Sequence, residues 1–440
     1  MAGLRSRGRF GVTLGLDRIE ALLAELGNPE RALRGALVAG TNGKGSVVAM
    51  AGSVLRAGGL RTGEMPKPHL VSYRERIVVD GLPLEPTAFA AALAPALAAA
   101  DRVAPAAGIP TEFEVLTAAG FAELARQRVD VAVVEVGLGG RLDATNAADL
   151  GVAAITTIQH DHERHLGRTL AAIGSEKAAI IKPGNLAVSG VMGRGLVPIR
   201  DRCRALDVRL VQAGPSGDYR AVLHGMDWTG TWIDITTPRA DWTSVRLGLI
   251  GRHQAHNAAV AVALLDALQT DADRRGIPFD LDENSIRAGL AAAHWPGRLE
   301  RVETPDGTVV LDGAHNPAGA RVLTESLAEL GVRGVPMVFG AMTGKRVSAV
   351  LRQLAALKPL PIFTAVGDPH ALPPDRLLRT WRRVTGLDRG EEAGRMAATP
   401  AEALAMARLL RRGDEPVLVS GSLYLVGAIR ALITGTEPDE

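Results

Sequence analysis

A chain of 440 residues is too long to fold around one hydrophobic core, so two or three domains are expected. Hydrophobic residues make up 47% and charged residues 22% of the chain, a composition that excludes a disordered protein. Fifty basic and 48 acidic residues leave a net charge of +2, which gives no electrostatic reason to bind nucleic acid or a membrane surface. The single cysteine, Cys203, excludes an intramolecular disulfide, fits a cytoplasmic protein and is expected to be a buried small residue.

The first part of the chain alternates short runs rich in Val, Ile and Leu with Ala- and Leu-rich helical stretches. Continuous apolar strands that alternate with helices are typical of a parallel sheet covered on both faces. Strands are predicted at 36–40, 129–137 and 151–158. Residues 219–238 and 244–251 instead alternate apolar and polar side chains, which predicts a small antiparallel sheet at the margin of the same domain. A helix over 253–269 follows.

The same alternation returns near the C-terminus, with strands predicted at 308–314, 335–342, 361–367 and 415–422. Pro296 and Gly297 interrupt a helical pattern just before this region. The sequence therefore predicts an α/β protein of two domains. We expect an N-terminal P-loop ATPase domain at 1–296, with a parallel sheet and the small antiparallel sheet, and a C-terminal Rossmann-like α/β domain at 297–440.

The segment GTNGKGS, residues 40–46, lies between a predicted strand and a predicted helix. A glycine-rich turn in this position lets backbone N–H groups and a helix N-terminus surround phosphate oxygens. The usual nucleotide-binding signature places Ser or Thr directly after the lysine, whereas here Gly45 separates Lys44 from Ser46. We expect Lys44 to contact the β- and γ-phosphates of a nucleotide, and Ser46 to contact a phosphate or a magnesium ion. The alternative is a glycine-rich turn without a ligand.

Glu135 stands near the end of the predicted strand at 129–137, and a glycine-rich turn leads from it to Asp143. A carboxylate at the carboxyl end of a parallel strand points into the crevice where open α/β sheets bind ligands. Glu135 is therefore a candidate magnesium ligand. A solvated acid at the end of a strand explains this residue equally well.

Three histidines, His160, His162 and His165, follow the predicted strand at 151–158. Such a cluster suggests zinc. However, neighbouring residues on an extended segment point to opposite sides, so only one or two of these side chains can face one ion. Zinc is the weaker interpretation, and His160 and His165 are expected to be solvated surface residues.

Lys177 lies next to Glu176 in a helix predicted over 171–184. Two surface charges are the simplest explanation of this pair. Desolvation can also lower the pKa of a lysine enough to leave a neutral amine that carries chemistry. The local sequence does not decide between these two roles.

The predicted strand at 308–314 includes Asp312 and is followed by His315 and Asn316. Polar side chains at this position suit ribose hydroxyls, a carboxylate or a proton transfer. Alternatively, Asn316 caps a helix that starts near Pro317. Because this cluster is distant in sequence from the phosphate loop, any joint site is expected to lie between the two domains.

These segments, in this order, resemble the folylpolyglutamate synthase and dihydrofolate synthase family of the Mur ligase superfamily. The resemblance covers nearly the whole chain and includes VAGTNGKGS, PHLVSYRERI, TEFEVLTAAGFAELA, VVEVGLGGRLDATN, DHERHLGRTLAAIGSEKAAIIKPG, HNAAVAVALL, WPGRLE and LDGAHNPAGA. It implies an ATP-dependent, ADP-forming ligase that adds L-glutamate to tetrahydrofolate, to dihydropteroate or to both, through an acyl phosphate. It also implies a monomer whose partners are small molecules.

The same resemblance implies roles for individual residues. The implied catalytic residues are Lys44, His162 and Lys177. The implied ATP-binding residues are Thr41, Asn42, Gly43, Lys44, Gly45, Ser46, Asn257, Arg298, Asp312 and His315. The implied magnesium ligands are Ser46, Glu135, His162 and Lys177, the last one after carbamylation has turned its ammonium into a carboxylate-like group. The residues implied for the folate or glutamate side are Phe113, Thr117, Arg141 and Asp143.

The implied cofactors are ATP and Mg²⁺ at two sites, with K⁺ as a further candidate. One departure from the family bears on them, because Lys67 stands where the family usually has a serine that binds magnesium. An ammonium group cannot ligate a cation. Either water, Ser46, Glu135 and His162 complete the first magnesium site, which we favour, or Lys67 replaces part of the charge of the ion near the phosphates. A second departure is Leu37, where the family frequently has histidine.

Two alternatives stay open at the level of the sequence. A cell-wall amino-acid ligase of the same superfamily would share the phosphate loop and the carbamylated lysine, although PHLVSYRERI and EVGLGGRLDATN favour the folate branch. A nucleotide-binding homologue that has lost ligation is the other alternative, and the departure at Lys67 keeps it open.

Overall fold

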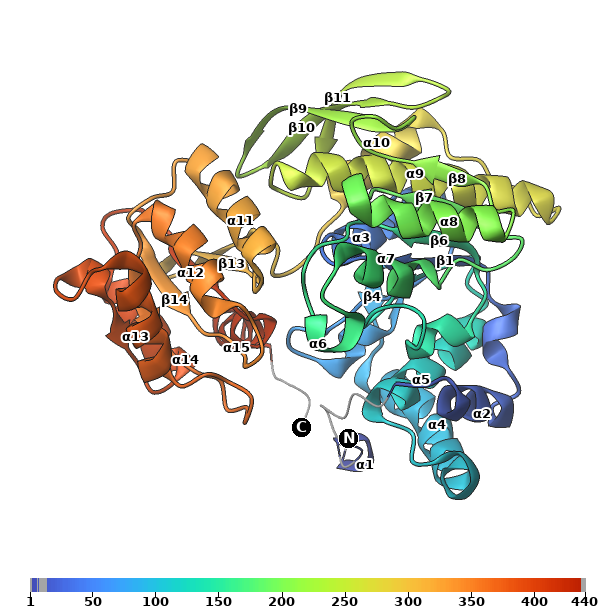
Figure 1. The fold of residues 1–440 in the computed structure, drawn as a ribbon, viewed down its shortest axis with the longest axis horizontal. Coiled ribbons are helices and arrows are strands. Elements are labelled where there is room, and N and C mark those ends of the chain that lie inside the picture. Colours follow the sequence, from blue (N-terminus) through green and yellow to red (C-terminus); the bar gives the residue numbers. More distant parts are fainter. Residues whose placement is uncertain (1, 6, 8–13, 437–440) are drawn as a thin grey trace.

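The computed structural model describes residues 2–5, 7 and 14–436, which fold into two lobes (Figure 1). The N-terminal lobe, blue to yellow in Figure 1, holds an eight-stranded and a three-stranded sheet. The C-terminal lobe, orange to red, holds a six-stranded sheet. The strands of the first two sheets end at Leu247, and those of the third begin at Glu300. The α/β class predicted from the sequence is confirmed.

The large sheet of the N-terminal lobe has the strand order β4-β3-β2-β5-β1-β6-β7-β8. In this order, β2, β5, β1, β6, β7 and β8 run parallel to one another. Its strands are β1 Gly35–Ala39, β2 Thr62–Met65, β3 Val78–Val79, β4 Leu82–Pro83, β5 Val131–Glu135, β6 Gly151–Ile155, β7 Leu186–Ser189 and β8 Leu210–Gln212. Every residue of β1 is buried, with Leu37 and Ala39 in one core and Ala36 and Val38 in another. Burial on both faces explains why this strand is a continuous apolar run.

Helices cover both faces of this sheet. The core around Leu37 contains residues of α2, α4, α5, α7 and α8, and the core around Val38 contains residues of α3, α9 and α10. The helices of this lobe are α1 Ala2–Arg5, α2 Asp17–Glu25, α3 Lys44–Ala57, α4 Pro86–Ala107, α5 Glu112–Gln127, α6 Glu163–Leu166, α7 Leu170–Ala178, α8 Val197–Ala205, α9 His253–Arg274 and α10 Glu283–Ala292. Because the central strands are parallel, the loops after β1, β5 and β6 leave the sheet at the same edge.

Cys203 lies in α8 and is buried in the core around Leu37. Burial raises the pKa of its thiol to about 11, so the thiol is protonated at neutral pH. The expectation of a buried, unreactive cysteine is confirmed.

The small sheet is antiparallel, as predicted, with the order β11-β10-β9. Its strands are β9 Arg220–Asp227, β10 Gly230–Thr236 and β11 Asp241–Leu247. Ile233, Ile235, Val245 and Leu247 bury their side chains in the core that also contains α3 and α9. The sheet thus belongs to the N-terminal lobe, at the upper edge of the molecule in Figure 1.

One expectation about a helix was wrong. The helix predicted over 171–184 ends at Ala178, and the following Ile180 and Ile181 turn into the core. Pro183 disfavours helical backbone in the residue before it, which limits how far this helix can extend. Lys177, in the last turn, is buried and not a surface residue.

Helix α4 continues through Pro95 and Pro105 for 22 residues. By length and composition alone it is a candidate membrane span. In the fold it packs against α2 and α5, with Phe89, Leu93 and Ala96 buried. The apolar composition of α4 is therefore explained by the side of the helix that is buried against the rest of the lobe.

The C-terminal lobe contains one sheet of order β12-β13-β17-β14-β15-β16, in which only the β12–β13 pair is antiparallel. Its strands are β12 Glu300–Thr304, β13 Gly307–Asp312, β14 Pro336–Phe339, β15 Leu360–Phe363, β16 Arg395–Met396 and β17 Val417–Ser420. Its helices are α11 Pro317–Glu329, α12 Val347–Leu354, α13 Pro374–Thr385, α14 Pro400–Leu410 and α15 Leu423–Thr434. Residues of α11, α12 and α13 pack in one core and residues of α14 and α15 in another, so this sheet too is covered on both faces.

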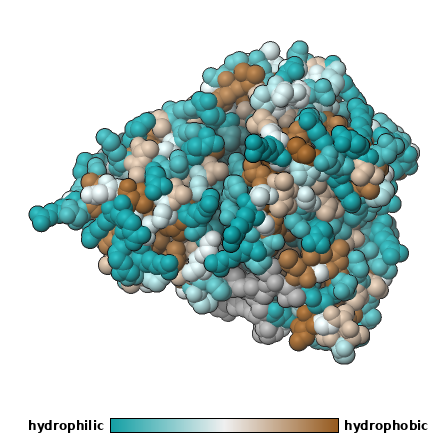
Figure 2. All heavy atoms as spheres, in the orientation of Figure 1, coloured by the Kyte–Doolittle hydropathy of each residue, from teal (hydrophilic) through white to brown (hydrophobic). Residues whose placement is uncertain are grey.

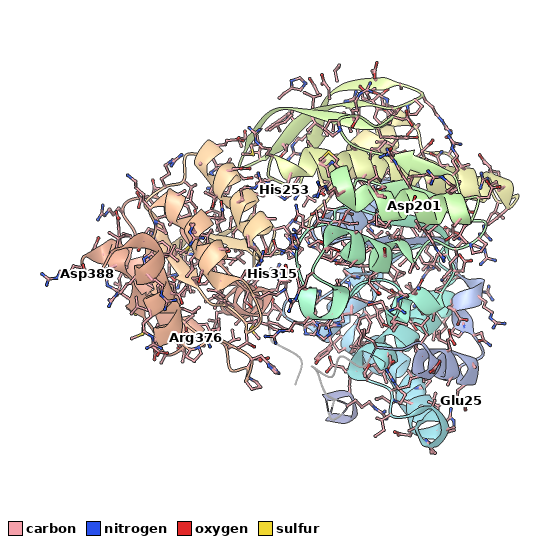
Figure 3. The ribbon with its side chains drawn as sticks, viewed as in Figure 1. Glu25, Asp201, His253, His315, Arg376 and Asp388 are labelled. Atoms are coloured by element: carbon pink, nitrogen blue, oxygen red, sulfur yellow. The ribbon has the colours of Figure 1, made fainter. Side chains whose placement is uncertain are left out.

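Hydrophilic side chains cover most of the face seen in Figure 2, and the apolar residues on it form small separate groups. His253 and His315, one from each lobe, lie where the lobes meet in Figure 3. The junction between the lobes is therefore the place to look for a site.

Candidate active site

The phosphate loop, residues 40–46, connects β1 to α3 and is held by the segment that follows β6. The backbone N–H of Thr41 donates to the carbonyl of Thr157 at 2.8 Å, and the N–H of Asn42 donates to the hydroxyl of Thr157 at 3.0 Å. The hydroxyl of Thr156 donates to the carbonyl of Asn42 at 2.6 Å. Helix α3 begins at Lys44, so its free N-terminal N–H groups face the loop. The loop has the fixed backbone and the helix N-terminus that a phosphate site needs.

Two glycines of the loop are required by close contacts. Gly43 has a φ of 86°, and a Cβ atom there would collide with the side-chain amide of Asn257 on α9. A Cβ atom at Gly45 would lie 2.5 Å from the indole ring of Trp295. The glycine between Lys44 and Ser46, which makes the motif irregular, is thus where α3 abuts Trp295.

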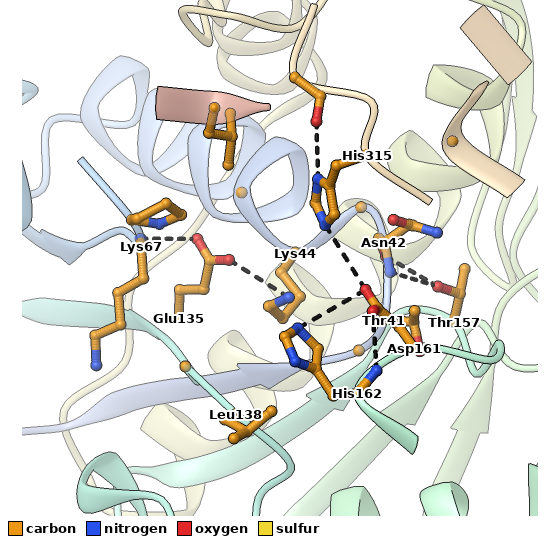
Figure 4. Close-up of a pocket in the computed structure, with 18 of the residues that line it drawn as sticks. Thr41, Asn42, Lys44, Lys67, Glu135, Leu138, Thr157, Asp161, His162 and His315 are labelled. Carbon is orange, nitrogen blue, oxygen red and sulfur yellow. Dashed lines mark hydrogen bonds and ion pairs between the residues drawn. The ribbon is translucent and has the colours of Figure 1, made fainter. Parts of the chain in front are cut away.

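Glu135, the last residue of β5, lies beside the phosphate loop and is buried. One of its carboxylate oxygens is 3.7 Å from Lys44 Nζ, and the other accepts the backbone N–H of Lys67 at 3.1 Å (Figure 4). Burial raises the pKa of Glu135, and the nearby Lys44 opposes this rise. The carboxylate therefore faces the position of the phosphates and is stabilised there by a cation.

Asp161 and His162 follow β6 and are contacted from the C-terminal lobe. Lys345 Nζ lies 2.9 Å from Asp161 Oδ1 and 3.3 Å from His162 Nε2, and His315 Nε2 lies 3.7 Å from Asp161 Oδ2. Desolvation opposes ionisation of Asp161, but His315 and Lys345 hold its pKa well below the usual range. Desolvation and Lys345 lower the pKa of His162 to about 4, so its imidazole is neutral at pH 7 and can accept a metal ion.

Lys177 projects from the last turn of α7 toward the start of the phosphate loop. Only 5% of the residue is exposed, and its Nζ donates to the carbonyl of Gly40 at 3.0 Å. Burial, and to a lesser extent the nearby Lys44, lower the pKa of this ammonium to about 7. A neutral amine is therefore well populated near neutral pH, which is the form that reacts with carbon dioxide.

The C-terminal lobe contributes the loop after β13. Asp312 is buried, and its two oxygens accept the backbone N–H groups of Leu299 and Ala314, each at 2.9 Å. Burial raises the pKa of Asp312, and Arg298 opposes this rise. Asn316 caps α11 by accepting the N–H of Gly319 at 2.8 Å, and its amide also donates to Asn42 Oδ1 at 3.0 Å. The capping alternative for Asn316 is thus correct, and the same side chain joins the two lobes.

One cavity of about 610 Å³ between the lobes is lined by Lys44, Glu135, Asp161, His162, Lys177 and Asp312. Of the residues proposed from the sequence, the lining includes Thr41, Asn42, Gly43, Lys44, Gly45, Ser46, Phe113, Glu135, Asp143, His162, Lys177, Asn257, Arg298, Asp312 and His315. Two proposed residues are elsewhere. Thr117 is buried within α5, and Arg141 is largely exposed and paired with Glu176 at 2.9 Å. The structure thus brings the polar residues that follow strands of both lobes into one cavity, and their role as a joint site stays a prediction.

The histidine cluster does not form a zinc site. His160 is 3.1 Å from Glu163 and about half exposed, and His165 is also exposed. Within residues 2–5, 7 and 14–436, no group of three His, Cys, Asp or Glu side chains is arranged to hold a metal ion. Only His162 is oriented by contacts across the lobes.

Several lining residues were missed by sequence reasoning, above all Lys345 and Asp161. Lys345 follows β14, a predicted strand, by six residues, so the rule that selected Glu135 and Asp312 at strand ends could have pointed to its loop. Nothing in the sequence shows that it reaches Asp161 of the other lobe, because that contact depends on how the lobes are placed. Gln159 was also missed, and its side chain accepts the side-chain amide N–H of Asn42, a residue distant in the sequence, at 2.6 Å.

Comparison with known proteins fits this architecture. Residues 38–265 match the Mur ligase middle domain, and residues 297–423 match the Mur ligase, glutamate ligase domain. A folylpolyglutamate synthase of Lacticaseibacillus casei is 35% identical over 99% of this chain and 98% of its own. The chain belongs to the folylpolyglutamate synthase and dihydrofolate synthase family. A dihydrofolate synthase/folylpolyglutamate synthase of Mycobacterium tuberculosis is 36% identical over 96% of this chain and 90% of its own.

Solved structures of family members have the same fold. A Mycobacterium tuberculosis folylpolyglutamate synthase complexed with ADP has a TM-score of 0.89 at 33% identity, covering 99% of this chain and 97% of that chain. An Escherichia coli relative, solved in complex with DHPP and ADP, has a TM-score of 0.84 at 28% identity and covers 99% and 96%. This family membership makes the chain an enzyme of the ligase class.

The residues present fit a magnesium ion bound together with a nucleotide. Such an ion commonly takes one or two carboxylates, with phosphate oxygens and water as its other ligands, and needs no full protein cage. Glu135 provides a carboxylate held at the loop, and Ser46 provides a buried hydroxyl in the first turn of α3. His162 provides a neutral imidazole.

Proposed function

We propose that this protein catalyses the ATP-dependent addition of L-glutamate to the carboxylate of tetrahydrofolate, of dihydropteroate or of both, with release of ADP and phosphate. The observation that carries the proposal is the shared cavity, in which the Lys44 loop of one lobe faces the Asp312–His315 loop of the other. The full-length similarity to folylpolyglutamate and dihydrofolate synthases supports this function over that of a cell-wall ligase.

The N-terminal lobe would bind the triphosphate. Backbone N–H groups of the phosphate loop would surround the phosphate oxygens, and Lys44 would neutralise charge on the phosphoryl group that is transferred. Asn257 and Arg298 would contact the rest of the nucleotide together with Asp312 and His315. The Asn316–Asn42 and Lys345–Asp161 contacts support this assignment, since they hold the two halves of the nucleotide site together.

Ligation would proceed in two steps. The acceptor carboxylate attacks the γ-phosphorus in line, the bond from phosphorus to the β-phosphate oxygen breaks, and ADP leaves. The amino group of glutamate then attacks the acyl carbon, phosphate departs with the bridging oxygen, and the amine loses a proton. Positioning and fixed charges would supply most of the rate enhancement, and closure of the lobes would exclude the water that hydrolyses an acyl phosphate.

Magnesium would be held by Ser46, Glu135 and His162, and a second ion would use Lys177 after carbamylation. When bound, the metal supplies charge neutralisation for the transferring phosphoryl group. The supporting observation for carbamylation is the buried amine at Lys177, whose pKa is lowered to about 7. K⁺ would be an additional cofactor, and its effect is measured by replacing it with Na⁺ in the assay.

We further propose a cytoplasmic monomer with a domain boundary between residues 296 and 297. The single cysteine and the small-molecule substrates support the compartment. The boundary is supported by the strands, because the last strand of the N-terminal sheets ends at Leu247 and the first strand of the C-terminal sheet begins at Glu300.

The experiment that tests the function measures ADP release with glutamate and either tetrahydrofolate or dihydropteroate. We expect ADP release only when both glutamate and an acceptor are present, with a glutamylated product detected by mass spectrometry. Nucleotide binding without acceptor-dependent ADP release would support instead the homologue that has lost ligation. Nucleotide binding and ligation must be compared because Lys67 stands where the family usually has a serine that binds magnesium.

A further inference from the structure

Lys67 stands at the wall of the inter-lobe cavity, and its side chain ends in a buried ammonium group. Lys67 lines the cavity, and its Nζ lies 4.1 Å from the centre of the Phe113 ring. Among the residues that the structure describes, no donor–acceptor partner contacts this nitrogen. A buried charge without hydrogen bonds is costly, and the face of one aromatic ring offsets only part of that cost.

Two carboxylates whose charges act on Lys67, those of Asp143 and Glu135, are engaged elsewhere. Asp143 accepts the backbone N–H of Leu138 at 2.8 Å with one oxygen and the hydroxyl of Thr145 at 2.6 Å with the other. Glu135 faces Lys44 with one oxygen and accepts the backbone N–H of Lys67 with the other. Among the described residues, the ammonium of Lys67 is therefore left without a bonded anion.

The direction of the side chain separates Lys67 from the phosphate position. In Figure 4 its backbone nitrogen faces the Glu135 carboxylate, while Nζ points away from Glu135. Lys67 thus does not place its charge where a metal ion would sit beside Glu135. Lys44 thus stands at the phosphate loop and Lys67 beside Phe113, and both residues line the cavity.

Phe113 is fixed in the position that supports this ammonium. A Cβ atom at Gly137 would lie 2.8 Å from Phe113 Cζ and 3.0 Å from Asp143 Oδ2, so the ring packs directly on the glycine backbone. A second cation, Arg76, lines the same cavity and donates from Nε to His69 Nδ1 at 2.8 Å. This end of the cavity therefore combines two cationic residues, Lys67 and Arg76, with a closely packed aromatic ring.

We propose that Lys67 binds the acceptor carboxylate that does not react, and that it thereby favours acceptors that already carry glutamate. This inference rests on the proposed function. The terminal glutamate of a folate has two carboxylates, of which one is activated at Lys44 and the other is free to pair with Lys67. Dihydropteroate has a single carboxylate, the one that reacts, and so leaves Lys67 without a partner.

The test compares the wild type with Lys67→Met, which keeps the length of the side chain and removes its charge. Michaelis constants are measured for tetrahydrofolate and dihydropteroate, and calorimetry measures binding of both acceptors in the presence of AMPPCP. We expect the substitution to weaken the binding of tetrahydrofolate about 10- to 100-fold more than the binding of dihydropteroate. This is the loss expected when one hydrogen bond to a charged group is removed. Lys67→Arg is expected to restore part of the difference.

Controls separate this effect from loss of folding. Lys358→Met removes an exposed lysine far from the cavity and is expected to behave as the wild type. Thermal unfolding of Lys67→Met reports whether the fold is retained, and the ratio between the two acceptors is insensitive to the fraction of active enzyme.

Equal losses for the two acceptors, or a loss confined to ATP or Mg²⁺ dependence, would overturn the assignment of Lys67. A wild type that ligates glutamate to dihydropteroate but does not bind tetrahydrofolate would also overturn it, while leaving the ligase function intact. If neither acceptor is ligated, the proposed function fails, and the calorimetric comparison still decides whether Lys67 distinguishes the two acceptors.

Discussion

The two ends of the cavity differ in how their charges are satisfied. At the phosphate end, Lys44 faces Glu135, Lys345 pairs with Asp161, and Lys177 donates to the phosphate loop. At the Phe113 end, the ammonium of Lys67 is buried without such a partner in the described part of the chain. A site whose charges are already paired is preorganised for a ligand common to a whole family, whereas an unpaired charge is completed by one particular substrate.

Loss of Lys44 is the strongest test of the phosphate end. Lys44→Ala is expected to lower kcat by about 10²- to 10³-fold or more, because it removes the cation that faces the transferring phosphoryl group. The fold should persist, since burial already raises the pKa of Glu135 and the carboxyl can take up a proton when its cation is lost. Steady-state ADP release measures the effect, and the melting temperature checks the fold. Turnover close to that of the wild type would contradict the assignment of this loop.

Removal of carbon dioxide tests Lys177. Enzyme depleted of carbon dioxide is expected to lose about 10- to 100-fold in activity and to recover with bicarbonate, as is usual when the support of a metal site is removed. The pKa of Lys177 is lowered to about 7, so the neutral amine increases as the pH rises from 6 to 8, and at an equal concentration of dissolved carbon dioxide recovery should be faster at the higher pH. Lys177→Arg is the control, because a guanidinium cannot be carbamylated. Absence of a ¹³C-carbamate signal from labelled bicarbonate would refute this role.

Gly45→Ala tests why the motif is irregular. The added Cβ atom would lie 2.5 Å from the indole of Trp295, so we expect a loss of about 1–3 kcal/mol in the free energy of unfolding and weaker ADP binding. Gly225→Ala, where a Cβ atom meets nothing within 4 Å, is the matched control. Denaturant unfolding measures both variants. If Trp295→Phe does not recover part of the loss in the double variant, the contact is not the reason for the glycine.

Local sequence patterns predicted the fold well because the central strands of the two larger sheets are buried on both faces. β1 and β13 were recognisable as apolar runs, and the glycines, Lys44, Glu135 and Asp312 could be placed at strand ends. These features depend on chemistry within a few residues. The family resemblance then supplied roles that the local pattern left undecided, such as that of Lys177.

What could not be predicted depends on contacts between distant segments. Lys345 reaches Asp161 from 184 positions away in the sequence, and the indole of Trp295 abuts Gly45. Lys67 was recognised as a departure, but its direction was not, since the sequence does not show that its backbone N–H faces Glu135 while Nζ packs on Phe113. Thr117 and Arg141 were placed at the cavity by motif alone, and the structure has the first buried in α5 and the second paired with Glu176.

The most direct test of ligation in this cavity follows oxygen from the acceptor into phosphate. Acceptor labelled with ¹⁸O in its reacting carboxylate is incubated with ATP and glutamate, and the inorganic phosphate is analysed by mass spectrometry. Attack on the γ-phosphorus followed by displacement by the amine predicts one ¹⁸O atom transferred to phosphate for each amide bond formed. Product formation with unlabelled phosphate would contradict the acyl phosphate and the role given to the two lobes.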